Sequence, residues 1–414
     1  MTAGRERSVQ VVCNNVTSQK EHPLRATGVV SWVSAVLAMV CVGAWTGCAK
    51  APPEPTSAVS VVPERSFVRE WELDLRLPKG AEVKALHTVG DFLFAYTTDR
   101  TSYVVDKKTG RLVTIHVLQG LGDILPPMVD GKRFAYPIST TVQVFGLDGK
   151  LERTVQLGSP VRSTGVALGE TLLIGVVGLN GGRIRAIDPN RQFDTAPWEV
   201  LTFGAILAAP KAFDGVAFFA TESGRVYAVN ENGAPVWPLE TGYFQGGGVL
   251  ADLAVDEQGL YVASTDTRLY VLDRNRGRVL WQYFSGQPLY DAAIPVDEVV
   301  FLPVRGQGLV ALANGTDGAF NRKPLWVSRD AVKLLATDND FAFVLLRGNS
   351  LGALSKKTGA VVFRSAPTDL DLFVTNPVEG GLLYGASKSG RVLAVRPVTR
   401  PGVVGEPLFV TVRR

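Results

Sequence analysis

The sequence has 414 residues, of which 46% are hydrophobic, and its formal net charge is +4. So small an excess of Lys and Arg predicts no basic surface for nucleic acid. The sequence also has no acidic tail of the kind that would indicate disorder. A chain of this length would ordinarily form two or three domains, unless it is built from repeats that each add only to their neighbours.

An uncharged apolar run occupies residues 29–45, between Arg25 and Cys48. This layout is typical of an export signal, although the run is close to the roughly 17–25 residues of a membrane-spanning helix, so a retained signal anchor is the alternative. The residues Thr46-Gly47-Cys48 resemble a bacterial lipobox, which implies that Cys48 is lipidated. We therefore expect an export signal over residues 1–47 and a lipid-anchored protein of the bacterial cell envelope.

The segment that follows the export signal, residues 48–66, is rich in proline and lacks hydrophobic periodicity. We interpret it as an extended tether, or as a disordered segment without any length requirement. The three cysteines are Cys13, Cys41 and Cys48, so the rest of the chain contains none. An exported domain without disulfides must be held together by its core alone.

From Phe67 onward the chain repeats one short phrase, which is clearest at Gly259–Trp281. There, Leu260–Ser264 and Leu269–Leu272 are β-prone runs separated by a turn, and Val279 begins a third run. The residue that follows each "Tyr-x-Val/Leu" strand recurs at intervals of 40–43 residues. The eight positions of this column are Asp106, Asp148, Asp188, Asn230, Asp273, Ala313, Ser355 and Arg396.

Two further columns keep the same phase. Prolines recur at every second period, and an aromatic residue follows most positions of the first column. We predict that these aromatic side chains pack between neighbouring repeats, where truncating a buried Trp to Ala costs about 3–5 kcal/mol; for Trp281 a binding platform is the alternative. The columns are Pro127, Pro210, Pro295 and Pro377, and Trp71, Trp198, Trp237, Trp281, Trp326 and Phe363.

Each copy can be divided into four strands, which in the fifth copy are residues 249–255, 260–264, 269–273 and 279–283. Such short links leave no room for a crossover helix, so the strands must be antiparallel neighbours. Four-stranded sheets at this period predict an all-β fold, an eight-bladed β-propeller over residues 67–414. A β-solenoid is the alternative, although its coils generally have shorter periods.

The last copy supplies only three strands, so its fourth must come from another part of the chain. Residues 67–77, which contain Trp71, and residues 407–413, which contain Phe409, are the two candidates. We predict the N-terminal segment, because pairing one end of the chain with the other removes the last open sheet edge.

The residues Leu269–Trp281, LYVLDRNRGRVLW, are similar to the repeat of the pyrroloquinoline-quinone-like propeller family. In that family a Tyr-x-Leu-Asp strand, a Thr-Gly-Lys turn and a Trp recur in each blade, and residues 103–111, 226–233 and 351–359 match in part. The resemblance covers residues 67–414 and implies the propeller fold. It does not imply one function, because the same repeat serves dehydrogenases, signalling modules and scaffolds.

The resemblance implies specific chemistry for the quinone-dependent enzymes of the family: an adjacent Cys pair, a Ca²⁺ site and a catalytic Asp. No Cys pair exists here, and Asp338-Asn339-Asp340 and Asp369-x-Asp371 fall short of the six to eight oxygen ligands of Ca²⁺. His87 and His116 lie in strand patterns without a partner at metal-binding spacing. We expect no catalytic residue, metal or cofactor, and therefore no enzyme.

Five charged residues fall where the innermost strands are expected to begin, near the central channel. Focused charge there could attract a ligand. The simpler interpretation, which we favour, is that these side chains only solvate the channel mouth. They are Arg162, Asp252, Asp291, Lys333 and Asp371.

Eight repeats, a lipid anchor and the lack of a catalytic set resemble the lipid-anchored members of this family that are scaffolds in β-barrel protein assembly. The resemblance implies a monomer on the outer membrane, facing the periplasm, with a membrane-associated protein complex as its partner. Many short loops on a rigid propeller suit protein docking. The alternatives are a ligand- or glycan-binding propeller lipoprotein and, less favoured, a pyrroloquinoline-quinone-dependent dehydrogenase.

Overall fold

The computed structural model describes residues 66–398, except residues 180, 192–194, 238–246, 317 and 377–380. All of these residues belong to one compact unit, Val61–Arg414. The export signal over residues 1–47, the lipidation site Cys48 and most of the tether lie outside the described residues.

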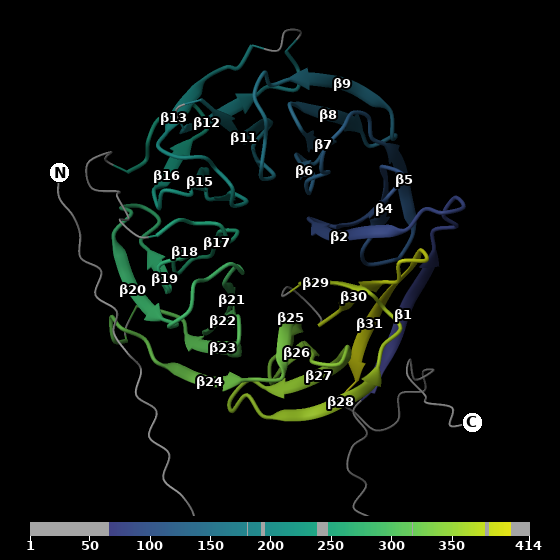
Figure 1. Cartoon of the computed structure of the whole chain (residues 1–414), viewed down its shortest axis with the longest axis vertical. Coiled ribbons are helices and arrows are strands. Elements are labelled where there is room, and N and C mark those ends of the chain that lie inside the picture. Colours follow the sequence, from purple (N-terminus) through teal and green to yellow (C-terminus); the bar gives the residue numbers. More distant parts are fainter. Residues whose placement is uncertain are drawn as a thin grey trace, which may run out of the picture. The chain divides into compact units, whose positions relative to one another are not determined.

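The described residues form eight separate antiparallel sheets, or blades, arranged in a ring (Figure 1). Blades 1 to 4 consist of β2 (Val83–Val89), β3 (Phe92–Thr97), β4 (Thr101–Asp106) and β5 (Leu112–Val117); β6 (Met128–Val129), β7 (Arg133–Ile138), β8 (Thr141–Gly146) and β9 (Leu151–Gln156); β10 (Val166–Leu168), β11 (Thr171–Gly178), β12 (Gly181–Ile187) and β13 (Glu199–Thr202); β14 (Lys211–Phe213), β15 (Val216–Ala220) and β16 (Val226–Asn230). Blades 5 to 8 consist of β17 (Ala254–Val255), β18 (Leu260–Ala263), β19 (Arg268–Leu272) and β20 (Val279–Phe284); β21 (Ile294–Val296), β22 (Val299–Val304), β23 (Gly308–Ala313) and β24 (Pro324–Ser328); β25 (Ala331–Thr337), β26 (Phe341–Leu346), β27 (Ser350–Ser355) and β28 (Val361–Pro367); β29 (Leu372–Val374), β30 (Leu383–Ala386), β31 (Arg391–Val398) and β1 (Ser66–Asp74).

The predicted all-β, eight-bladed propeller is therefore confirmed. Seven blades have four strands, and blade 4 has three within the described part of the chain. At its outer edge the amide of Val236 donates to the carbonyl of Ala228 at 2.9 Å, next to the undescribed residues 238–246. The chain thus begins a fourth strand in the same position as in the other blades.

The N-terminal strand closes the ring. β1 pairs antiparallel with β31 over Ser66–Asp74, with Trp71 opposite Ala394. This pairing confirms the prediction that the first segment completes the last blade, and joins the two ends of the described chain in one sheet. The alternative segment, residues 407–413 with Phe409, lies outside the described residues.

The innermost strand of blade 5 is shorter than predicted. In blade 5 only Ala254–Val255 pair with β18, whereas the sequence predicted a strand over residues 249–255. The preceding residues bond to blade 4 instead, because the amides of Val249 and Leu253 donate to the carbonyls of Thr221 and Ala209. The missing part of the strand thus serves to join two blades.

The middle strands of each blade are buried on both faces. β18 is buried at all four positions, as is β4 from Thr101 to Val105. Each of these strands is covered by a neighbouring blade on either side, so it reads as a continuous apolar run rather than an alternating one. The core consequently consists of layers between blades, such as Phe94 against Phe134 with ring centroids 5.7 Å apart.

Candidate functional site

The Trp residues predicted to lie between repeats contact the neighbouring blade. Each indole lies against the turn between the third and fourth strands of the next blade, and its Nε1 donates to a carbonyl of that turn. The donor and acceptor pairs are Trp71 with Lys107 (3.1 Å), Trp198 with Glu231 (2.8 Å), Trp237 with Arg274 (2.6 Å) and Trp326 with Lys356 (2.7 Å).

A glycine in each of these turns makes room for the ring. A Cβ on Gly233 or Gly277 would lie 2.6 Å from an indole carbon, and a Cβ on Gly359 would lie 2.5 Å away. These glycines also have positive φ, which other residues rarely adopt. The glycine of this turn is therefore the surface on which the preceding blade's Trp rests.

Trp281 and Phe363 depart from this arrangement. Trp281 is 1% exposed, but its Nε1 has no hydrogen-bond partner among the described residues, and the Arg322 guanidinium lies 5.2 Å from its ring centroid. Phe363 packs on Phe67, with ring centroids 5.4 Å apart. In blade 8 the third strand, β31, continues to Val398, so Phe363 has no turn carbonyl like the one that each of the four Trp residues binds. A Phe ring has no N–H, so no donor is left unpaired there.

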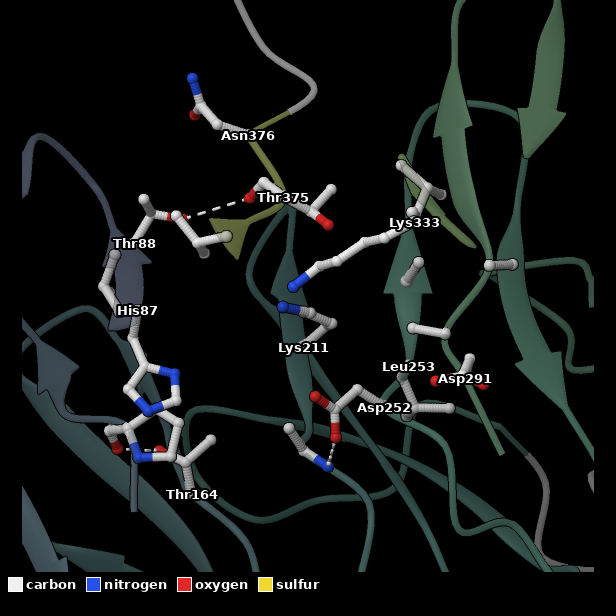
Figure 2. A pocket seen from close by; sticks show the side chains of 18 of the residues that line it. His87, Thr88, Thr164, Lys211, Asp252, Leu253, Asp291, Lys333, Thr375 and Asn376 are labelled. Atoms are coloured by element: carbon white, nitrogen blue, oxygen red, sulfur yellow. Dashed lines mark hydrogen bonds between the residues drawn. The ribbon is translucent and has the colours of Figure 1, made fainter. Parts of the chain in front are cut away.

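A central channel of about 1340 Å³ is lined by residues in or next to the innermost strands of all eight blades. Figure 2 shows part of its wall. Of the predicted channel residues, Asp252, Asp291 and Lys333 line it. Arg162 and Asp371 are exposed and are not among the described lining residues. Asp371 instead accepts a hydrogen bond from the amide of Lys388 at 2.7 Å.

The polar side chains of the channel mostly bind neighbouring innermost strands. The Asp252 carboxylate accepts from the amide of Ala209 at 2.8 Å, and Lys333 Nζ donates to the carbonyl of Phe373 at 2.6 Å. Thr164 likewise donates to the carbonyl of Pro126 at 2.5 Å. These bonds fasten one blade to the next, so the charges do more than solvate the mouth of the channel.

Lys211 lines the channel and was not identified from the sequence. It follows Pro210, one of the periodic prolines, and Pro127 and Pro295 of the same column also line the channel. The proline column lies in or next to the innermost strands, so it could have identified Lys211 as a channel residue from the sequence.

The two histidines of the propeller are both shifted toward the neutral form. Burial, and then the charge of Lys333, lowers the pKa of His87 in the channel to about 4. Burial lowers the pKa of His116 to about 4 as well. His116 is fully buried, with Nδ1 at 2.7 Å from the Tyr136 hydroxyl and its ring stacked on Phe145 at 4.4 Å.

The acidic pairs nearest to a calcium motif have structural partners. The Asp338 carboxylate accepts from the amides of Asp340 and Phe341 at 2.9 and 2.7 Å, and Asp369 pairs with Arg391. No group of three or more His, Cys, Asp or Glu residues suited to a metal ion occurs within the described residues.

Among the described residues, no helix has the length and apolar character needed to cross a membrane.

One face of the ring exposes a set of large apolar side chains. This face carries the turns between the second and third strands and the links between blades. Hydrogen bonds join these turns to the links; for example, the amide of Leu289 donates to the carbonyl of Ser264 at 3.2 Å. We call the set the apolar loop face. It comprises Val117, Leu121, Leu179, Leu201, Phe203, Leu250, Phe284 and Tyr290.

Three exposed aromatic rings of the apolar loop face each have an arginine over them. The rings are 60%, 63% and 40% exposed for Phe203, Phe284 and Tyr290. Aromatic residues and arginine are the types that most often anchor protein interfaces. The pairs are Arg225 over Phe203 (4.2 Å), Arg268 over Phe284 (5.6 Å) and Arg305 over Tyr290 (4.5 Å).

Comparison with known proteins supports the same fold. Residues 180–399, just over half of the chain, match the protein family described as "Outer membrane protein assembly factor BamB". The crystal structure of BamB from Moraxella catarrhalis is similar, with 19% identity and a TM-score of 0.59 over 80% of this chain and 97% of that one. The computationally designed Ika8 protein gives 15% identity and a TM-score of 0.59 over 78% and 98%. No curated protein sequence matches the chain significantly.

Proposed function

We propose that this chain, which belongs to the outer membrane protein assembly factor BamB family, is a non-catalytic scaffold of the cell envelope. In this proposal it is a monomer, anchored through a lipid on Cys48 to the outer membrane and facing the periplasm. Its partner is a membrane-associated protein complex that assembles β-barrel proteins.

The observation that carries the proposal is the apolar loop face. Phe203 and Phe284 expose apolar surface to water, which is unfavourable. A bound partner would remove this surface from water. Several large apolar side chains exposed on one face favour an interaction site there. A docked protein would also bury the arginines stacked on these rings, which can donate to its backbone carbonyls or carboxylates.

Affinity capture from membranes tests the proposal. The full-length protein is crosslinked in cells, purified and compared with a variant that carries Phe203→Ser and Phe284→Ser. We expect subunits of the barrel-assembly machinery with the wild type and at least a tenfold lower yield with the variant, because truncating two interface anchors costs about 2 kcal/mol or more in total.

A matched control removes two exposed leucines from strands away from the apolar loop face. Leu151 and Leu325 lie near the starts of the outer strands β9 and β24, at the opposite end from that face, and are 41% and 53% exposed. Leu151→Ser with Leu325→Ser should leave capture unchanged. Equal loss in both variants, or capture of the machinery by neither wild type nor variants, would contradict the proposal.

A further inference from the structure

The central channel contains more cationic than acidic side chains. Five Lys or Arg residues and two Asp residues line it within the described part of the chain, which leaves an excess of three positive charges while His87 is neutral. The cations are Lys107, Lys211, Arg305, Lys333 and Arg347, and the acids are Asp252 and Asp291.

Lys211 is a cation of the channel wall without an acidic partner among the described residues. Its side chain points into the channel from β14 (Figure 2). It makes no hydrogen bond or ion pair with any residue that the structure describes, and its side chain is exposed to the channel solvent. An ammonium group with three donors and no protein acceptor is available to a ligand.

Lys333 supplies a second ammonium group, which is held in place. Its Nζ donates to the Phe373 carbonyl at 2.6 Å, so two of its three N–H groups remain. Burial lowers the pKa of Lys333, with a smaller opposing effect from Asp291. The ammonium group has thus lost part of its hydration, and an anionic ligand would supply interactions in place of the lost water.

The two acids do not cancel these charges. The Asp252 carboxylate accepts from the amide of Ala209 at 2.8 Å, and an Asp291 carboxylate oxygen lies 3.9 Å from Arg305 Nε. The remaining wall is largely proline, alanine and valine, including Pro127, Pro210 and Pro295. Walls of low polarity around a cationic channel focus its field and concentrate anions inside it.

We infer that the central channel binds a small anion with two or more negative charges, held between Lys211 and Lys333. Two or more negative charges would match the two ammonium groups, whose side chains come from blades 4 and 7 and both extend into the channel (Figure 2). The cavity is large enough for a molecule such as a di- or tricarboxylate, which would retain part of its water. This inference does not depend on the apolar loop face, because that set of side chains lies outside the channel.

Calorimetric titration of the full-length protein in detergent tests the inference. The probes are citrate and inorganic phosphate, with acetate as a monovalent control, in a low-salt buffer that contains no other polyvalent anion. We expect citrate to bind with a dissociation constant below about 10 mM and acetate not to bind in that range. Acetate binding as tightly as citrate, or no binding of either polyvalent anion, would overturn the inference.

Two channel variants should move the affinity in opposite directions. Lys211→Met removes one charge and should weaken citrate binding about tenfold, as expected for one charge pair about 6 Å apart at an effective dielectric constant of about 40. Asp252→Asn keeps an oxygen for the Ala209 amide while removing a negative charge, so it should tighten binding several-fold.

Lys150→Met is the matched control. This lysine lies in the turn between β8 and β9, outside the channel, and its side chain is 84% exposed. It removes the same charge and should leave the affinity unchanged. If Lys150→Met weakens citrate binding as much as Lys211→Met, the anion responds only to net charge and the channel site is excluded.

Discussion

The contact between a Trp and the glycine turn of the next blade should make a methyl group added in that turn more destabilising than backbone strain alone. In the Gly277→Ala variant the new Cβ would lie 2.6 Å from Trp237, which is 4% exposed and cannot move into solvent. Overpacking of this kind costs about 1–3 kcal/mol. Because Gly277 also has a φ of +71°, the strained backbone adds about 1–2 kcal/mol.

Gly215→Ala is a control that measures the cost of backbone strain alone. Gly215 has a φ of +74° in a turn of blade 4, and no heavy atom lies within 4 Å of its Cβ position. Its substitution should therefore cost only about 1–2 kcal/mol. The difference between the two variants, about 1–3 kcal/mol, measures the packing of the turn against Trp237.

Urea unfolding followed by circular dichroism gives both free energies of unfolding. A double variant, Gly277→Ala with Trp237→Phe, should lose less stability than the sum of the two single variants, because the smaller ring accommodates the methyl group. Equal losses for Gly277→Ala and Gly215→Ala, together with strict additivity in the double variant, would show that this contact does not join the blades.

Further predictions concern single side chains and the lipid. Trp326→Phe should cost about 1 kcal/mol more than Trp281→Phe in urea unfolding, because only Trp326 loses an Nε1 hydrogen bond; equal costs would contradict this. The folded-state pKa of His116, about 4, lies below its unfolded value near 6.5, so its contribution to stability is complete above about pH 6.5 and is lost as the pH falls towards 4. Between pH 7 and pH 5 His116 should contribute about 2 kcal/mol to the loss of stability, and that contribution should be absent in His116→Phe, whereas the contribution of His87 should remain; an unchanged pH dependence in the variant would refute it. Cys48→Ser should release the protein from membranes, because the acyl chains contribute about 0.8 kcal/mol per buried CH₂, and recovery of residues 29–48 on the mature protein by mass spectrometry would indicate a signal anchor instead. With pyrroloquinoline quinone, Ca²⁺ and an alcohol or sugar, dye reduction should stay at the protein-free blank, and turnover would favour an enzyme.

The sequence by itself determined the number of blades, the strands within them and the segment that closes the ring. Strand pairing inside a blade joins neighbours in the chain, so alternating strands and turns at a period of 40–43 residues are enough to predict it. Closure was predictable for a similar reason, because Trp71 keeps the phase of the repeat although β1 lies far from β31 in sequence.

The sequence placed Asp252, Asp291 and Lys333 at the channel, but the rest of its lining and the apolar loop face were decided only by the tertiary structure. Asp252 and Asp371 occupy comparable places in the repeat, yet one lines the channel and binds the adjacent blade, whereas the other binds the amide of Lys388. Lys211 and Lys333 come from repeats far apart in the chain, and no local pattern links them. The direction of such side chains depends on how each innermost strand packs against its two neighbours, and that packing is set by the closed ring as a whole.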